Sequence, residues 1–229
     1  NATLQHTDTQ DLDIYTIDDT TKLFLTNAPL IQKVQRTETI QLHFLTNEAE
    51  VKVILEEYNS SDVSAGDVLF PSSAHVVSRK SGIITVDIST MLSTTSYFTI
   101  KLCNVAGTTF FSVTMRFNID DVCFDDQVRL KWVNPLGGID AYTFKGQHKE
   151  ELRFSTKTFQ KALSKSFTQQ DRGETTLRTD GIDYVDVFSV AEPRATIQWL
   201  SEIGLSSDVW IEDNGYIPVT VNTRKVKTL

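Results

Sequence analysis

The sequence of 229 residues predicts a mainly β protein, in which an immunoglobulin-like β-sandwich precedes a β-rich α+β domain with one helix and a C-terminal hairpin. In the first half, turn-forming residues separate six short runs rich in Val, Ile, Phe and Thr, the spacing expected of a sandwich. In the second half, two hairpin patterns flank a single helical pattern. Hydrophobic residues make up 40% of the chain and charged residues 23%, as in folded globular proteins.

Residues 1–21 are acidic and rich in Thr, with few apolar side chains, so we expect an N-terminal extension there. The sandwich is then expected over 22–119. Its predicted strands are 22–25, 39–45, 50–58, 82–88, 97–103 and 109–117.

The segment 39–45 has the clearest strand pattern. Ile40, Leu42 and Phe44 alternate with polar residues, among them His43. A strand with this pattern turns its apolar side chains to the core and its polar ones to solvent. His43 is therefore expected on the surface and not in a ligand site.

Four aspartates mark the predicted boundary between the domains: Asp120, Asp121, Asp125 and Asp126. Calcium prefers such oxygen ligands, but the spacing of a calcium-binding loop is missing. Solvated acids at a domain junction are the simpler interpretation. We therefore expect no metal, and a second domain over 120–229.

This second domain is expected to open with a β-hairpin. Two nearly alternating runs, 130–133 and 141–144, enclose a loop of turn-forming residues. The hairpin contains no nucleophile and no metal cluster, so its role is predicted to be structural. The residues that define it are Trp132, Asn134, Gly137, Gly138, Asp140 and Phe144.

A strand-like segment at 151–163, a polar loop around 169–174 and a strand at 182–190 follow the first hairpin. The one predicted helix spans 193–203, where Pro193 suits the first turn and apolar residues form a stripe. Gly204 fits the position after the helix, with Leu205 folding back on the last turn.

A second hairpin is predicted at 208–221. Its Asn-Gly pair suits a type I′ turn, and its proline places one strand at a sheet edge. Because exposed edge strands pair with neighbours, this hairpin is the sequence's candidate for extending into another subunit. The residues concerned are Trp210, Asn214, Gly215, Tyr216 and Pro218.

Catalytic signatures are missing from the sequence: it has no nucleophile elbow, no zinc-protease motif, no phosphate loop and no dinucleotide fingerprint. The four histidines fall in separate regions. We therefore expect no enzyme activity and no cofactor. Cys103 and Cys123 stand twenty positions apart, which allows a disulfide or half of a metal site. Two small buried hydrophobic residues are the preferred interpretation, and we expect both cysteines to be reduced.

The net charge of −8 argues against nucleic-acid binding, which needs clustered Lys and Arg. The one basic run is short and lies at 224–227. No apolar run approaches the roughly 20 residues of a membrane-spanning helix, so none is expected.

Five aromatic residues of the second half allow a sugar-stacking platform as an alternative to core packing. Packing is preferred, because the tryptophans lie in alternating strands or beside the helix stripe. The residues are Trp132, Tyr142, Trp199, Trp210 and Tyr216.

Two segments of the second half resemble tail and baseplate proteins of bacteriophages and prophages, of the distal-tail or tail-tube kind, especially those of Bacteroidetes-type hosts. The first has a tryptophan strand, an Asn-x-x-Gly-Gly loop and an Asp-x-x-x-Phe strand, at 132–144. The second is the helix followed by Ser-x-x-Val-Trp-Ile, at 206–211. The resemblance implies a sandwich or open barrel with one helix and a long hairpin.

The resemblance also implies a virion structural component that assembles as a ring and contacts itself or other tail proteins. It transfers no catalytic residues. The expected function is therefore structural, at the virion tail. The alternative is a cell-surface adhesin or carbohydrate-binding module, extracellular or on the cell surface, with a host glycan as its partner.

Overall fold

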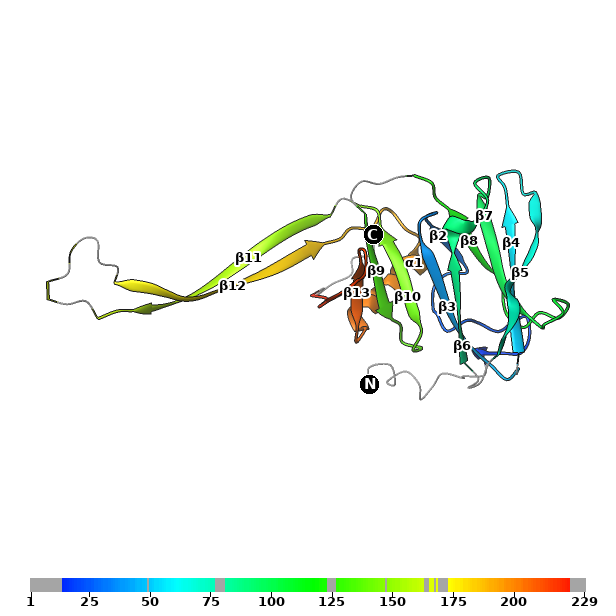
Figure 1. Ribbon diagram of the computed structural model, residues 1–229, viewed down its shortest axis with the longest axis horizontal. Coiled ribbons are helices and arrows are strands. Elements are labelled where there is room, and N and C mark those ends of the chain that lie inside the picture. The colour runs from blue at the N-terminus through cyan, green and yellow to red at the C-terminus, as the bar shows by residue number, and fades with distance from the viewer. Residues whose placement is uncertain are drawn as a thin grey trace.

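The computed structural model is a layered β structure from which one long hairpin projects (Figure 1). It describes residues 14–48, 50–76, 81–122, 127–146, 148–162, 165–166, 168 and 173–222, with 66–76 described for the backbone alone. The described strands form sheets of three, five, four and two strands, and one α-helix accompanies them. The predicted mainly β fold with a single helix is confirmed.

A five-stranded sheet forms the outer layer of the sandwich. Its order is β2-β8-β7-β4-β5, with β2 parallel to β8 and the other pairs antiparallel. The strands are β2 (Ile31–Val34), β4 (Glu50–Tyr58), β5 (Ser64–Val76), β7 (Tyr97–Cys103) and β8 (Met115–Ile119).

A three-stranded sheet forms the second layer, in the order β1-β3-β6. Its strands are β1 (Thr16–Ile17), β3 (Thr39–Thr46) and β6 (Ser81–Asp87), and a 3₁₀ turn, η3 (Ile88–Thr90), follows β6. Burial alternates residue by residue along β3, as its sequence predicts. Its apolar face and that of the five-stranded sheet share one buried cluster, which includes Phe44, Phe98 and Phe117.

A four-stranded sheet with the order β10-β9-β13-β14 forms the third layer (Figure 1). Its strands are β9 (Val128–Val133), β10 (Ile139–Phe144), β13 (Val209–Glu212) and β14 (Tyr216–Val219), and the helix α1 (Arg194–Leu200) continues into η4 (Ser201–Leu205). A second, smaller buried cluster lies between this sheet and the helix, around Trp132 and Trp199.

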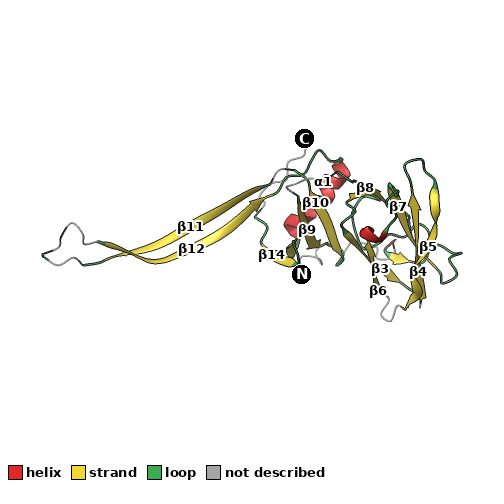
Figure 2. Cartoon of the chain, turned by 45° about the horizontal axis from the view of Figure 1, so that its top comes forward, coloured by secondary structure: helices red, strands yellow, loops and turns green. Residues whose placement is uncertain are grey.

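A long two-stranded hairpin, here called the arm, leaves the body between the third layer's strands. It consists of β11 (Lys149–Gln160) and β12 (Glu174–Asp186), antiparallel, with a register shift between Lys157 and Thr158. Figures 1 and 2 show it extending away from all three layers. None of its described residues belongs to either buried cluster.

The sandwich begins earlier than predicted. Thr16–Ile17 pairs with β3, and Ile17 is wholly buried, so part of the expected extension is a strand of the core. Residues 1–13 lie outside the described part. The expected strand at 22–25 is not one, whereas β2 and β5 were missed. Both buried clusters nevertheless fall on their own sides of the predicted boundary, apart from Ala28.

The helix ending was predicted wrongly. The α-helix stops at Leu200 and tightens into a 3₁₀ turn that contains Gly204. Leu205 is 66% exposed and does not fold back on the helix. Pro193 caps the helix from just before its first residue.

Candidate functional site

The predicted hairpin at 129–146 forms as β9 and β10, and its loop is locked onto the sandwich. Asn134 is buried, accepts hydrogen bonds from the backbone N–H groups of Leu136 and Gly138, and donates to the Leu25 carbonyl at 2.8 Å. Gly137 has φ +85°, a conformation that favours glycine. The loop residues therefore hold the turn, as expected, and also fasten it to the segment before β2.

Asp140 links the hairpin to the helix and to the sandwich. One of its carboxylate oxygens accepts hydrogen bonds from Trp199 Nε1 at 2.7 Å and from Thr26 Oγ1 at 2.9 Å. Burial raises the pKa of Asp140 to about 6, against the opposing effect of these donors. Nearby Glu202 accepts from Asn27, and burial raises the pKa of Glu202 to about 7.

A second buried polar cluster lies where β9 and β10 meet the start of β3. Arg129 pairs with Glu38 at 2.7 Å and with Glu212 at 2.9 Å. Thr143 donates to Glu38, which is 6% exposed. Arg129 also donates to the Thr39 carbonyl. A buried, multiply bonded Arg of this kind fixes the two layers relative to each other.

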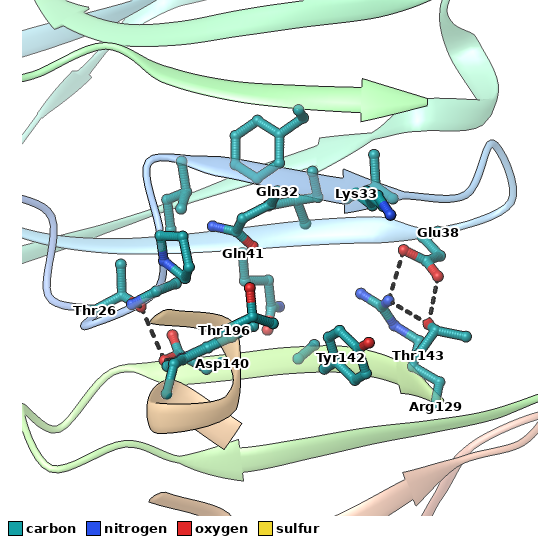
Figure 3. Close-up of a pocket in the computed structure, with 18 of the residues that line it drawn as sticks. Thr26, Gln32, Lys33, Glu38, Gln41, Arg129, Asp140, Tyr142, Thr143 and Thr196 are labelled. Carbon is teal, nitrogen blue, oxygen red and sulfur yellow. Dashed lines mark hydrogen bonds and ion pairs between the residues drawn. The ribbon is translucent and has the colours of Figure 1, made fainter. Parts of the chain in front are cut away.

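A cavity of about 360 Å³ lies between these two clusters. Its walls come from β2 and β3 on one side, and from β10 and the first turn of α1 on the other (Figure 3). Figure 3 shows Gln32, Gln41 and Thr196 turned toward its middle. In the part of the chain that the structure describes, their side chains make no hydrogen bond.

His43 was expected on the surface, and that expectation is wrong. The polar face of β3 is covered by the third layer, with the Cβ of His43 next to Gly138. Its Nε2 is buried without a hydrogen-bond partner among the described residues, and burial lowers the pKa of His43. When a second layer packs on the polar face of a sheet, the polar residues of that face are buried as well. Alternation in the sequence alone cannot predict this.

The aromatic residues pack as predicted where the sheet is apolar. Trp132 is fully buried, 5.2 Å from Trp199 between ring centroids, and Tyr142 lies edge-on to Trp199 and to Phe144. Trp210 is only half-buried, because it shares the opposite, polar face of the sheet with its cross-strand partner Lys131.

The predicted hairpin at 208–221 forms as β13 and β14, in which Val209 pairs with Val219 and Ile211 with Ile217. Because β13 also pairs with β9, the hairpin completes the third layer and does not project. Three residues, 213–215, separate the strands, so the expected two-residue type I′ turn is wrong, although Asn214 has φ +46°. Pro218 lies on an edge strand as predicted, and Tyr216 is 59% exposed.

The element that does project is the arm, which sequence analysis did not single out. Register places Leu152, Phe154 and Val185 on one face, where Phe154 is 67% exposed beside Gly181. The other face is largely charged, with Arg153 stacked over Tyr184. The sequence did contain a signal for the arm, namely two strand-like segments separated by a polar loop.

The aspartates at the junction are engaged in ion pairs where they are described. Asp120 pairs with Lys145 at 2.7 Å and Asp121 with Arg36 at 3.0 Å. Asp125, Asp126 and Cys123 lie outside the described residues. Among those described, no group of three metal-ligating side chains occurs, no helix is long and apolar enough to cross a membrane, and Cys103 is a buried free thiol.

No family model matches the chain, and no curated protein matches it in sequence.

Proposed function

We propose that this protein is a non-enzymatic structural component of a phage tail or prophage-derived particle, and that the arm joins one copy to the next. The single observation that carries the proposal is the set of exposed apolar side chains on the arm. Leu152 is 52% and Phe154 67% exposed, on a ribbon none of whose described residues belongs to either core cluster. A two-stranded ribbon is marginal in water by itself, and exposed apolar patches mark interaction sites.

Charge favours a second copy as the arm's partner. Over 149–186 seven Lys and Arg balance seven Asp and Glu, so the residues outside the arm carry the whole net charge of −8. Within the arm, the distal stretch 157–178 has five Lys and Arg against two Asp and Glu. A basic tip and an acidic body attract each other, which steers one copy onto another.

The assignment to a phage tail rests on the resemblance of the 132–144 and 206–211 segments. A projecting hairpin on a β-rich body with one helix agrees with the architecture that this resemblance implies. The ring is the natural closed product when a head-to-tail contact repeats. Other tail proteins remain partners in this proposal, through the open edge of β14.

The arm contact is tested by sedimentation velocity over a range of protein concentrations. We expect the full chain to associate, and Phe154→Ser to weaken association at least tenfold. Ile83→Ser is the matched control. Ile83 is 50% exposed but lies on β6 of the sandwich, so this variant should associate as the unaltered chain does. Salt should weaken association, because exposed charges are screened. Equal association by both variants would contradict the arm's role.

The location is tested in particles purified from the source culture. Mass spectrometry and immunogold labelling should find the protein at the tail. Its absence from particles, with tight glycan binding by the soluble protein, would favour the alternative of a cell-surface adhesin or carbohydrate-binding module. The cavity walled by β2, β3, β10 and α1 is the observation that favours this alternative.

A further inference from the structure

We propose that the cavity between β2, β3, β10 and α1 is a binding site for a neutral saccharide of one or two sugar units. The proposal is independent of the assembly proposed for the arm, since none of the arm's described residues lines the cavity. Its volume of about 360 Å³ lies at the lower end of the 300 to 1,000 Å³ typical of ligand pockets, on the order of a small ligand.

The cavity is held open by contacts that a ligand does not have to supply. At one end, Glu38 forms an ion pair with Arg129 and accepts a hydrogen bond from Thr143. At the other end, Thr26 and Trp199 donate to Asp140. Both ends join the sandwich to the third layer, so the walls are fixed before any ligand arrives, which lowers the entropy cost of binding.

Three of the polar groups inside the cavity are neutral and unsatisfied. Gln32, Gln41 and Thr196 come from three different elements, and within the described residues their side chains have no hydrogen-bond partners (Figure 3). Carboxamides and hydroxyls both donate and accept. A ligand that satisfies them needs adjacent donors and acceptors without net charge, as the hydroxyl groups of a sugar provide.

Most charged groups of the lining already have partners. Arg129 and Glu38 neutralise each other, and one oxygen of Asp140 accepts two hydrogen bonds. Lys33 also lines the cavity, without a hydrogen bond or ion pair among the described residues, so an acidic sugar is the charged ligand to compare with neutral ones. The apolar part of the lining includes Ile31, Pro193 and the ring of Tyr142, whose hydroxyl donates to Glu192. Such surfaces pack against the C–H groups of a sugar ring while the polar wall binds its hydroxyls.

The test is saturation-transfer NMR with glucose, galactose, mannose, N-acetylglucosamine and their common disaccharides, with glucuronate as a charged comparison. We expect a signal from at least one neutral sugar and a weaker one from glucuronate. Gln41→Leu and Thr196→Val should each weaken binding at least tenfold. Gln198→Leu, on the exposed side of the same helix, is the matched control and should bind as the unaltered protein does.

Thermal melts of each variant separate lost binding from lost folding. A chain in which residues 151–184 are replaced by Asn-Gly should bind the sugar unchanged, whatever happens to its self-association. Absence of a signal from every neutral sugar overturns the proposal, and so does binding that survives both Gln41→Leu and Thr196→Val.

Discussion

The sandwich and the four-stranded layer are stabilised in different ways. Among the side chains that the structure describes, the two sheets of the sandwich enclose a cluster of 19 buried hydrophobic residues. The corresponding cluster of the four-stranded layer and its helix has only five. That layer is instead fastened to the sandwich by buried polar contacts, chiefly those of Asn134, Asp140 and Arg129. Apolar burial tolerates repacking, whereas a buried polar contact fails when one partner is removed.

Trp132 should be the most sensitive position in the smaller core. It is fully buried beside Trp199, so Trp132→Ala is expected to lower the free energy of unfolding by about 3–5 kcal/mol. Trp210→Ala, on the half-exposed polar face, should lower it by only about 1–2 kcal/mol. Chemical denaturation of both variants measures the difference. Equal losses of unfolding free energy would mean that Trp132 and Trp210 are equally important to the fold, despite their different burial.

The buried carboxyl groups near the contact between the sandwich and the four-stranded layer should make the free energy of unfolding depend on pH. The pKa of Asp140 is raised in the fold to about 6, and that of Glu202 to about 7. Both groups therefore favour the folded state while protonated, and their contribution is lost as the pH rises from about 4 to about 7. For Asp140 the loss is on the order of 3 kcal/mol.

Denaturation at pH 5 and pH 8 measures this effect. Asp140→Asn keeps an acceptor for Trp199 and Thr26 but cannot ionise, so it should remove Asp140's share of the pH dependence and leave that of Glu202. An unchanged profile in that variant would assign the pH dependence to other groups.

The two glycines of the hairpin loop give a sharper test of the fastening. A Cβ at Gly138 would lie 2.5 Å from the Leu25 carbonyl oxygen, so Gly138→Ala must push the loop from the sandwich. We expect a loss of about 2–3 kcal/mol. Gly137→Ala meets no atom within 4 Å but has φ +85°, and should cost about 1 kcal/mol. The reverse order in thermal melts would show that turn strain outweighs the contact.

The smallest effect is expected from the arm. Replacing residues 151–184 by Asn-Gly joins Glu150 to Val185, which face each other in the ribbon, through a turn suited to a hairpin. Because no residue in the described part of the arm belongs to either core, the melting temperature should stay within experimental scatter. A clear drop in the isolated monomer would mean that the arm supports the body.

Local patterns predicted the local elements well. Alternation identified β3, turn residues identified β9–β10, and the proline of β14 identified an edge. Contacts between layers could not be predicted, because Thr26, Glu38 and His43 meet their partners across about a hundred residues of chain. The paired arm was missed for a related reason, since its strands bury nothing and so lack the usual signal of a core face.

The arm also has a geometric consequence. Twelve residues of β11 at about 3.3 Å per residue give a reach of about 40 Å. If its tip carries the contact between copies, the ribbon acts as a ruler that sets their spacing. Two residues added to each strand would preserve which side chains share a face and lengthen the ruler by about 7 Å. The repeat of the resulting assembly would then grow in proportion, a change that electron microscopy can measure.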